Sequence, residues 1–207
     1  MSDLRAELRG EPAPPIPEFA VVVPSGWDEF APTDAAQTEL LDKAIERARQ
    51  AHRPDLAAQL RAYTGRAFAG MRSAETLRFY IQTDSWSDDV VLPLSITASL
   101  RRPPAGSTLD AVVTDLIRTK GAVALYDDKR FVRWQSRSTL GLGAGYVQQL
   151  STAYLTPVPG AQRTVALQFT AVVAAPADDT VDLETPFVRS MFDLTDAIVS
   201  TLVWHTT

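Results

Sequence analysis

Hydrophobic and polar positions alternate most regularly in residues 164–174, which read TVALQFTAVVA. One side of this segment is wholly apolar and comprises Val165, Leu167, Phe169, Ala171 and Val173. A period of two that is rich in β-branched and aromatic residues is typical of a strand with one face in the core. A second long alternating run, residues 146–156, comes just before it along the chain. The two runs predict an antiparallel hairpin at the centre of the fold.

Apolar residues spaced by three and four predict helices elsewhere in the chain. Thr33 and Ser107 stand where a helix N-cap is expected, and Thr185 with Pro186 gives a third start signal. Gly121 follows Lys120 and predicts the end of one of these helices. The predicted helices cover residues 33–50, 54–72, 107–120 and 186–204.

Shorter alternating runs predict further strands at residues 19–23, 77–82, 90–100, 122–126 and 130–137. Turns are predicted at residues 24–27, which include Trp27, and at residues 84–89. The glycine-rich stretch 140–145 is predicted to be a loop between two strands. The order of these elements predicts an α+β fold with a mostly antiparallel, twisted sheet of about six to seven strands sandwiched by helices.

Length and composition predict one globular domain at residues 19–207. Residues 1–18 are polar and then rich in proline, so we expect an extended or disordered arm there. Hydrophobic residues make up 45% of the chain and its net charge is −5, values that are typical of a soluble protein. We predict neither a secretion signal, a lipoprotein anchor nor a membrane span, and we expect a cytoplasmic protein. Cysteine and asparagine are both absent while Ala, Arg and Asp are abundant, which suggests a GC-rich bacterial genome.

Residues that commonly perform catalysis are scarce. The absence of cysteine excludes thiolate nucleophiles and thiolate metal sites. The histidines, His52 and His205, lack a second metal ligand at close spacing, and we expect both at helix ends. The glycines at 141, 143 and 145 run from strand to strand, unlike a nucleotide-binding loop. We therefore predict no catalytic residue, no metal site, no cofactor and no enzymatic activity.

Basic and aromatic residues alternate in the segment 129–137, KRFVRWQSR. As a strand it places Lys129, Phe131, Arg133 and Arg137 on one face and Trp134 on the other. Such a pattern is typical of an edge strand whose charges deter aggregation, of a protein-binding surface, or of a nucleic-acid-binding surface. The predicted partner-binding residues are Lys129, Phe131, Arg133, Trp134, Arg137 and, in the turn at 84–89, Trp86.

The sequence Val23-Pro24-Ser25-Gly26-Trp27 and the order of elements after it resemble the start and layout of Mog1/PsbP-like proteins. The resemblance implies a twisted antiparallel sheet between helices and a binding scaffold that is mostly non-enzymatic. Relatives of this kind include GTPase release factors, photosystem subunits and chaperones for secreted effectors. The helical insertion at 33–72 departs from that layout.

These observations favour a non-catalytic interaction protein, such as an adaptor or chaperone associated with a bacterial secretion system. The expected partner is a protein, nucleic acid is disfavoured, and a homodimer stays open as an alternative. The rival interpretation is a small-ligand-binding protein or a hydrolase that uses loop carboxylates together with Arg133. Candidate carboxylates lie at residues 84–89, 127–128 and 178–182.

Overall fold

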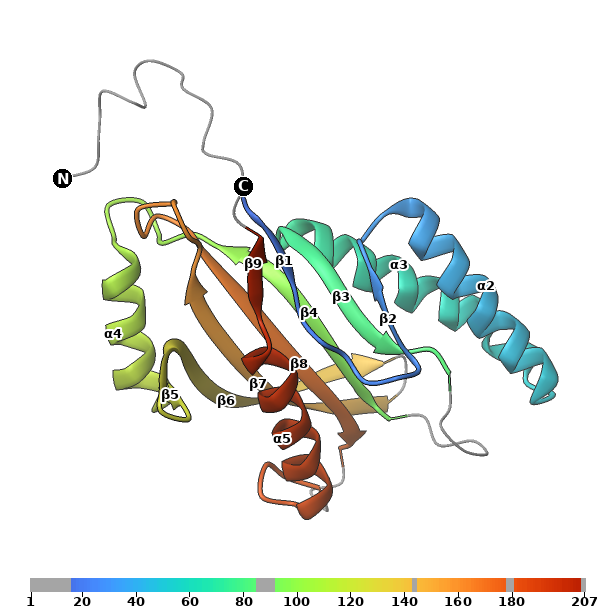
Figure 1. Cartoon of the computed structure of the whole chain (residues 1–207). Coiled ribbons are helices and arrows are strands. Elements are labelled where there is room, and N and C mark those ends of the chain that lie inside the picture. Colours follow the sequence, from blue (N-terminus) through green and yellow to red (C-terminus); the bar gives the residue numbers. More distant parts are fainter. Residues whose placement is uncertain (1–15, 85–91, 143–144, 178–180, 206–207) are drawn as a thin grey trace.

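The computed structural model describes residues 16–84, 92–142, 145–177 and 181–205 (Figure 1). The fold is α+β, as predicted. In chain order the elements are β1 (Glu18–Ala20), β2 (Trp27–Phe30), α2 (Asp34–Gln50), a 3₁₀ turn (Pro54–Leu56), α3 (Ala57–Ser73), β3 (Thr76–Gln82), β4 (Leu94–Arg101), α4 (Leu109–Lys120), β5 (Val123–Leu125), β6 (Asp128–Leu142), β7 (Gly145–Pro157), β8 (Ala166–Pro176), α5 (Pro186–Ser200) and β9 (Val203–His205).

The main sheet has seven strands in the order β2-β3-β4-β8-β7-β6-β5, and every neighbouring pair is antiparallel. Its centre is the predicted hairpin of β7 and β8, in which Tyr154 lies opposite Phe169. The predicted inner face of β8 is confirmed, because Val165, Leu167, Phe169, Ala171 and Val173 are all buried in one cluster. Burial of each large side chain in this cluster contributes roughly 1.5–3 kcal/mol.

Helices cover both faces of the sheet. On one face, α5 supplies Val188, Phe192 and Ile198 to the cluster that holds Phe169, and the β1–β9 ribbon adds Phe19. On the other face, α4 packs around Trp134 at the β6 end of the sheet. The pair α2 and α3 lies at the opposite end of the sheet (Figure 1), where Phe68 of α3 packs edge-to-face on Phe79 of β3. The face between α4 and the α2–α3 pair is lined by half-buried Ser and Thr residues of β4 and β8.

Two predictions at the ends of the domain are wrong. The strand predicted at 19–23 is shorter and lies outside the main sheet, because Phe19 packs edge-to-face on Phe169 and the strand pairs with β9 instead. The last helix ends at Ser200 and not at residue 204. Residues 203–205 pair with β1, so that segments from near both ends of the described chain lie side by side (Figure 1). His205 is accordingly in a strand and not at a helix end.

Three boundaries inside the chain also differ from prediction. Trp27 begins β2, because Gly26 adopts a φ of +78° and completes the turn before it. The predicted loop at 140–145 is mostly strand, since β6 continues to Leu142 and β7 begins at Gly145. The N-cap of α4 is Thr108, whose Oγ1 accepts a hydrogen bond from the backbone nitrogen of Ala111 at 3.2 Å. The predicted helix end at Gly121 is confirmed by its left-handed backbone, with φ of +63°.

Candidate functional site

The basic and aromatic segment 129–137 lies in β6, and the predicted alternation places its residues on two sheet faces. Phe131 faces α5 and is 1% exposed, while Trp134 faces α4 and is 8% exposed. Both aromatic rings therefore belong to the hydrophobic cores and offer no surface to a partner. Lys129 and Arg137 are exposed. Trp86 lies outside the described residues.

Arg133 is held in one orientation by α5. Its Nε donates to Oδ1 of Asp196 at 2.8 Å, and the hydroxyl of Tyr154 donates to the same oxygen. Tyr154 is buried on β7, and the side chains of Arg133 and Asp196 are only 20% and 10% exposed. Asp196 thereby joins two strands of the sheet to the helix above them. Among the described residues, Asp196 is the carboxylate that pairs with Arg133, and the hydroxyl of Tyr154 lies near the same guanidinium.

The environment of this cluster shifts the pKa of three groups. Burial raises the pKa of Tyr154, and the charge of Asp196 raises it further. Burial acts against the charged form of Arg133, but the hydrogen bond and charge of Asp196 outweigh it and raise the pKa of the guanidinium above its ordinary value. Burial also raises the pKa of Tyr126, assisted by the charges of Asp196 and Asp193. The tyrosines are therefore neutral and Arg133 is charged at physiological pH.

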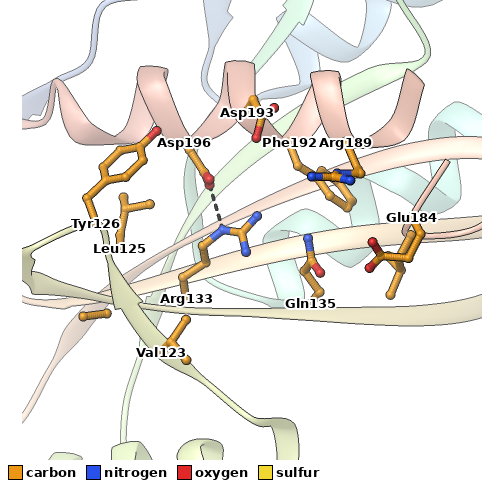
Figure 2. A pocket seen from close by; sticks show the side chains of 12 residues that line it. Val123, Leu125, Tyr126, Arg133, Gln135, Glu184, Arg189, Phe192, Asp193 and Asp196 are labelled. Atoms are coloured by element: carbon orange, nitrogen blue, oxygen red, sulfur yellow. Dashed lines mark hydrogen bonds and ion pairs between the residues drawn. The ribbon is translucent and has the colours of Figure 1, made fainter. Parts of the chain in front are cut away.

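A cleft of about 380 Å³ opens beside this cluster, between α5 and strands β5 and β6. Figure 2 shows the guanidinium of Arg133 in the cleft, with Gln135 of the same strand next to it. Arg189 reaches toward the cleft from α5, and Glu184 lies on the segment just before that helix (Figure 2). Apolar residues of β5 form another wall, where the exposed fraction of Val123 is 59%.

This arrangement presents a pre-oriented guanidinium to an open cleft. A guanidinium binds a carboxylate through two parallel N–H···O bonds when its donors are fixed in one plane. Asp196 fixes that plane through Nε, which leaves the amino groups of Arg133 to face the cleft. Arg189 adds a second positive charge, while Glu184 and Asp193 add negative charge at the rim. Two arginines and three carboxylates line the cleft, so the fixed donors of Arg133, and not the charge of the whole cleft, favour an acidic group.

Asp196 and Tyr154 belong to this cluster, although the sequence pattern did not single them out. In the sequence, Phe187, Met191, Leu194, Ile198 and Leu202 recur at spacings of three and four and so predict the inner stripe of α5, but Phe187 is 47% exposed. The buried stripe is rotated and comprises Val188, Phe192, Thr195, Asp196, Ile198 and Val199. The sequence signal that could have identified Asp196 is its position four residues after Phe192 and three before Val199, on the same helix face. A charged side chain on a buried helix face needs a partner.

Two other recesses have fewer charged groups in their walls. A cleft of about 530 Å³ between the end of α3 and strands β4 and β8 contains Arg102, which is paired with Glu75 at 3.2 Å. A smaller recess of about 390 Å³ lies beside Arg137 and Tyr146. The part of the chain that the structure describes holds no cluster of three His, Asp or Glu side chains suited to a metal ion. Within the same residues, no helix is long and apolar enough to cross a membrane.

Comparison with family models, with curated proteins and with solved structures found no match to this chain. The likeness to Mog1/PsbP-like proteins consequently stays a prediction, although the α+β architecture with its antiparallel sheet and packed helices is as expected.

Proposed function

We propose that this chain is a non-catalytic, cytoplasmic binding protein whose protein partner places an acidic group in the cleft beside Arg133. One observation carries the proposal: Asp196 holds the Nε side of Arg133, while the amino groups of its guanidinium face the cleft (Figure 2). A guanidinium that is oriented before binding loses less side-chain entropy when it captures a carboxylate.

Two further features support a binding role. The resemblance to Mog1/PsbP-like proteins implies a scaffold of this kind, including adaptors and chaperones of secretion systems. The rim of the cleft is apolar on the β5 side, where Val123 and Tyr126 are 59% and 63% exposed. Aromatic and apolar residues around a central arginine are typical of protein-binding surfaces.

The rival is a small-ligand-binding protein or a hydrolase, and the carboxylates in the cleft are the observation that favours it. Glu184, Asp193 and Asp196 all line the same recess as Arg133. Asp196 already accepts hydrogen bonds from Arg133 and Tyr154, which suits a residue that positions a guanidinium better than a general base. For this reason we favour binding over hydrolysis.

Affinity capture with two matched variants tests the proposal. Tagged wild-type protein, Arg133→Lys and Arg118→Lys are each incubated with lysate from cells that carry the native gene. Arg118 is on α4 and its side chain is 78% exposed, so the same substitution there controls for a general loss of arginine. We expect Arg133→Lys to retain about tenfold less partner than wild type, because lysine lacks the planar fork, and Arg118→Lys to retain the wild-type amount. Equal capture by all three proteins would contradict a partner site at Arg133.

A further inference from the structure

Strand β6 has an outer edge that β5 covers only in part. The last pairing between the two strands joins Val123 to Arg133, and the chain before Val123 turns away toward α4 at Gly121. On its inner side, β6 continues to pair with β7 as far as Leu142. In the described part of the chain, no strand pairs with the outer edge of β6 beyond Arg133.

Along this edge, the side chains of β6 are exposed on both faces of the sheet. The four consecutive residues Arg137, Ser138, Thr139 and Leu140 are all exposed, although their side chains alternate between the two faces. Natural edge strands are usually short or interrupted by proline, charge or a bulge. Here the segment from Gln135 to Leu140 contains no proline and a single charged residue, Arg137, and its pairing with β7 proceeds without a register shift.

An unpaired edge of this length is a template for an additional strand, which binds through backbone hydrogen bonds. A strand that prolongs the line of β5 runs antiparallel to β6, since β5 does. Its carboxyl end then arrives beside Val123 and the guanidinium of Arg133. A strand of the opposite direction brings its amino end to the same place. Charge complementarity with Arg133 selects the first direction.

We propose that the outer edge of β6, from Gln135 to Leu140, receives the extended C-terminal segment of a partner protein and that Arg133 holds its terminal carboxylate. This inference rests on the proposed function and specifies how the partner engages the cleft. A segment of six residues spans about 20 Å at roughly 3.3 Å per residue. Backbone pairing supplies affinity, and the bidentate contact with Arg133 selects a free carboxyl end.

The register also indicates which side chains the segment carries. Residues opposite Gln135, Arg137 and Thr139 lie on the face of α5. The positive charge of Arg137, whose guanidinium also donates to Gln148 of β7, favours an acidic side chain there. Next to them is the recess of about 390 Å³ formed by Arg137, Thr139, Tyr146, Gln148 and Ala177. Counting from Val123 opposite Arg133, the last residue of the segment falls opposite Gln135 and the third from the end falls opposite Arg137.

A designed peptide provides the probe. The acetylated hexapeptide Thr-Val-Thr-Glu-Thr-Val places its glutamate opposite Arg137, and it is prepared both with a free carboxylate and as the C-terminal amide. Backbone amide signals of the full-length protein are followed by NMR during titration to about 5 mM peptide, a range that detects weak binding. The exposed edge strand at the other end of the sheet, β2, is the internal control.

We expect the amide signals of residues 136–140 to shift with the free acid while those of β2 stay constant. The amide form is expected to bind about tenfold more weakly, and Arg133→Met, which lacks the charge and the donors, to remove that difference. Constant signals at residues 136–140 overturn the inference. If Arg133 signals still respond to the free acid in that case, the cleft proposal stands and only strand addition fails. Equal affinity for the acid and the amide overturns the role of Arg133 in binding the terminal carboxylate. If the signals of residues 136–140 shift with protein concentration and not with peptide, the edge binds a second copy of this chain and the inference is overturned.

Discussion

Removal of the Asp196 carboxylate is the perturbation that tests the cluster most directly. Asp196→Ala leaves the charge of Arg133 four-fifths buried without its partner and also removes the acceptor of the Tyr154 hydroxyl. Breaking a buried ion pair by deleting one partner costs about 3–5 kcal/mol. Because the guanidinium keeps some contact with solvent in the cleft, we expect a loss of about 3 kcal/mol in the free energy of unfolding.

Asp193→Ala is the matched control. Asp193 is on the same helix and lines the same cleft, but it is exposed and makes no hydrogen bond or ion pair with another described residue. Its removal is expected to change the free energy of unfolding by no more than about 0.5 kcal/mol. Comparing the two variants separates the effect of removing a charge that has a buried partner from the effect of removing a negative charge from the helix.

Equilibrium unfolding in urea, followed by both circular dichroism and tryptophan fluorescence, measures the two values. Coincident transitions with an unchanged denaturant slope are needed before a difference in midpoint is converted to free energy. If Asp196→Ala and Asp193→Ala lose the same small amount, Asp196 does not fix Arg133 to the sheet. The orientation argument for the cleft then fails with it.

Three further perturbations follow from the structure. Burial raises the pKa of Tyr80 and Tyr154 above the ordinary value of 10.0, so the unfolded chain loses these protons first and stability falls above pH 10 by about 1.4 kcal/mol per pH unit for each tyrosine. Tyr154→Phe should remove one such contribution, about 1.4 kcal/mol per pH unit, from the slope measured by urea unfolding at high pH, and an unchanged slope would contradict it. Gly121→Ala forces a positive φ of 63° on alanine and should lower the free energy of unfolding by about 1 kcal/mol. Gly65→Ala inside α3 should raise it by about 0.5–1 kcal/mol, since nothing lies within 4 Å of either added methyl group. Thermal unfolding midpoints that shift in the same direction for both variants would refute this. Phe68→Ala should cost about 3–5 kcal/mol as the one fully buried residue described in α3, and a loss below about 1 kcal/mol would show that α3 packs elsewhere.

The long strands and the helix starts could be predicted from the sequence because their signals lie within the segment itself. Alternation over many residues identified β7 and β8, and the N-cap and proline signals located the starts of α2 and α5. The short strands β2 and β9 escaped prediction, since segments of four and three residues carry too little periodicity. They exist because a distant segment offers a partner, as when Phe19 packs on Trp204 at 5.7 Å.

The candidate site was predicted only in part for a similar reason. The sequence singled out Arg133 but grouped it with Phe131 and Trp134, whose aromatic character equally suits a core. Which of the three stays near solvent depends on the positions of α5 and α4 over the two faces of β6. The contact with Asp196 joins residues 63 positions apart, and no local spacing encodes it.

The last question is whether the cluster of Arg133, Asp196 and Tyr154 serves stability or binding. A buried ion pair is often no more stabilising than apolar residues of similar volume. The triple variant Arg133→Met, Asp196→Leu and Tyr154→Phe removes all the charges and hydroxyls together, so no buried group in it loses a partner. We expect its free energy of unfolding to lie within about 1 kcal/mol of wild type, while capture of the partner falls as far as with Arg133→Lys. If the triple variant is as unstable as Asp196→Ala, the cluster is structural and its proximity to the cleft gives no support to a binding site.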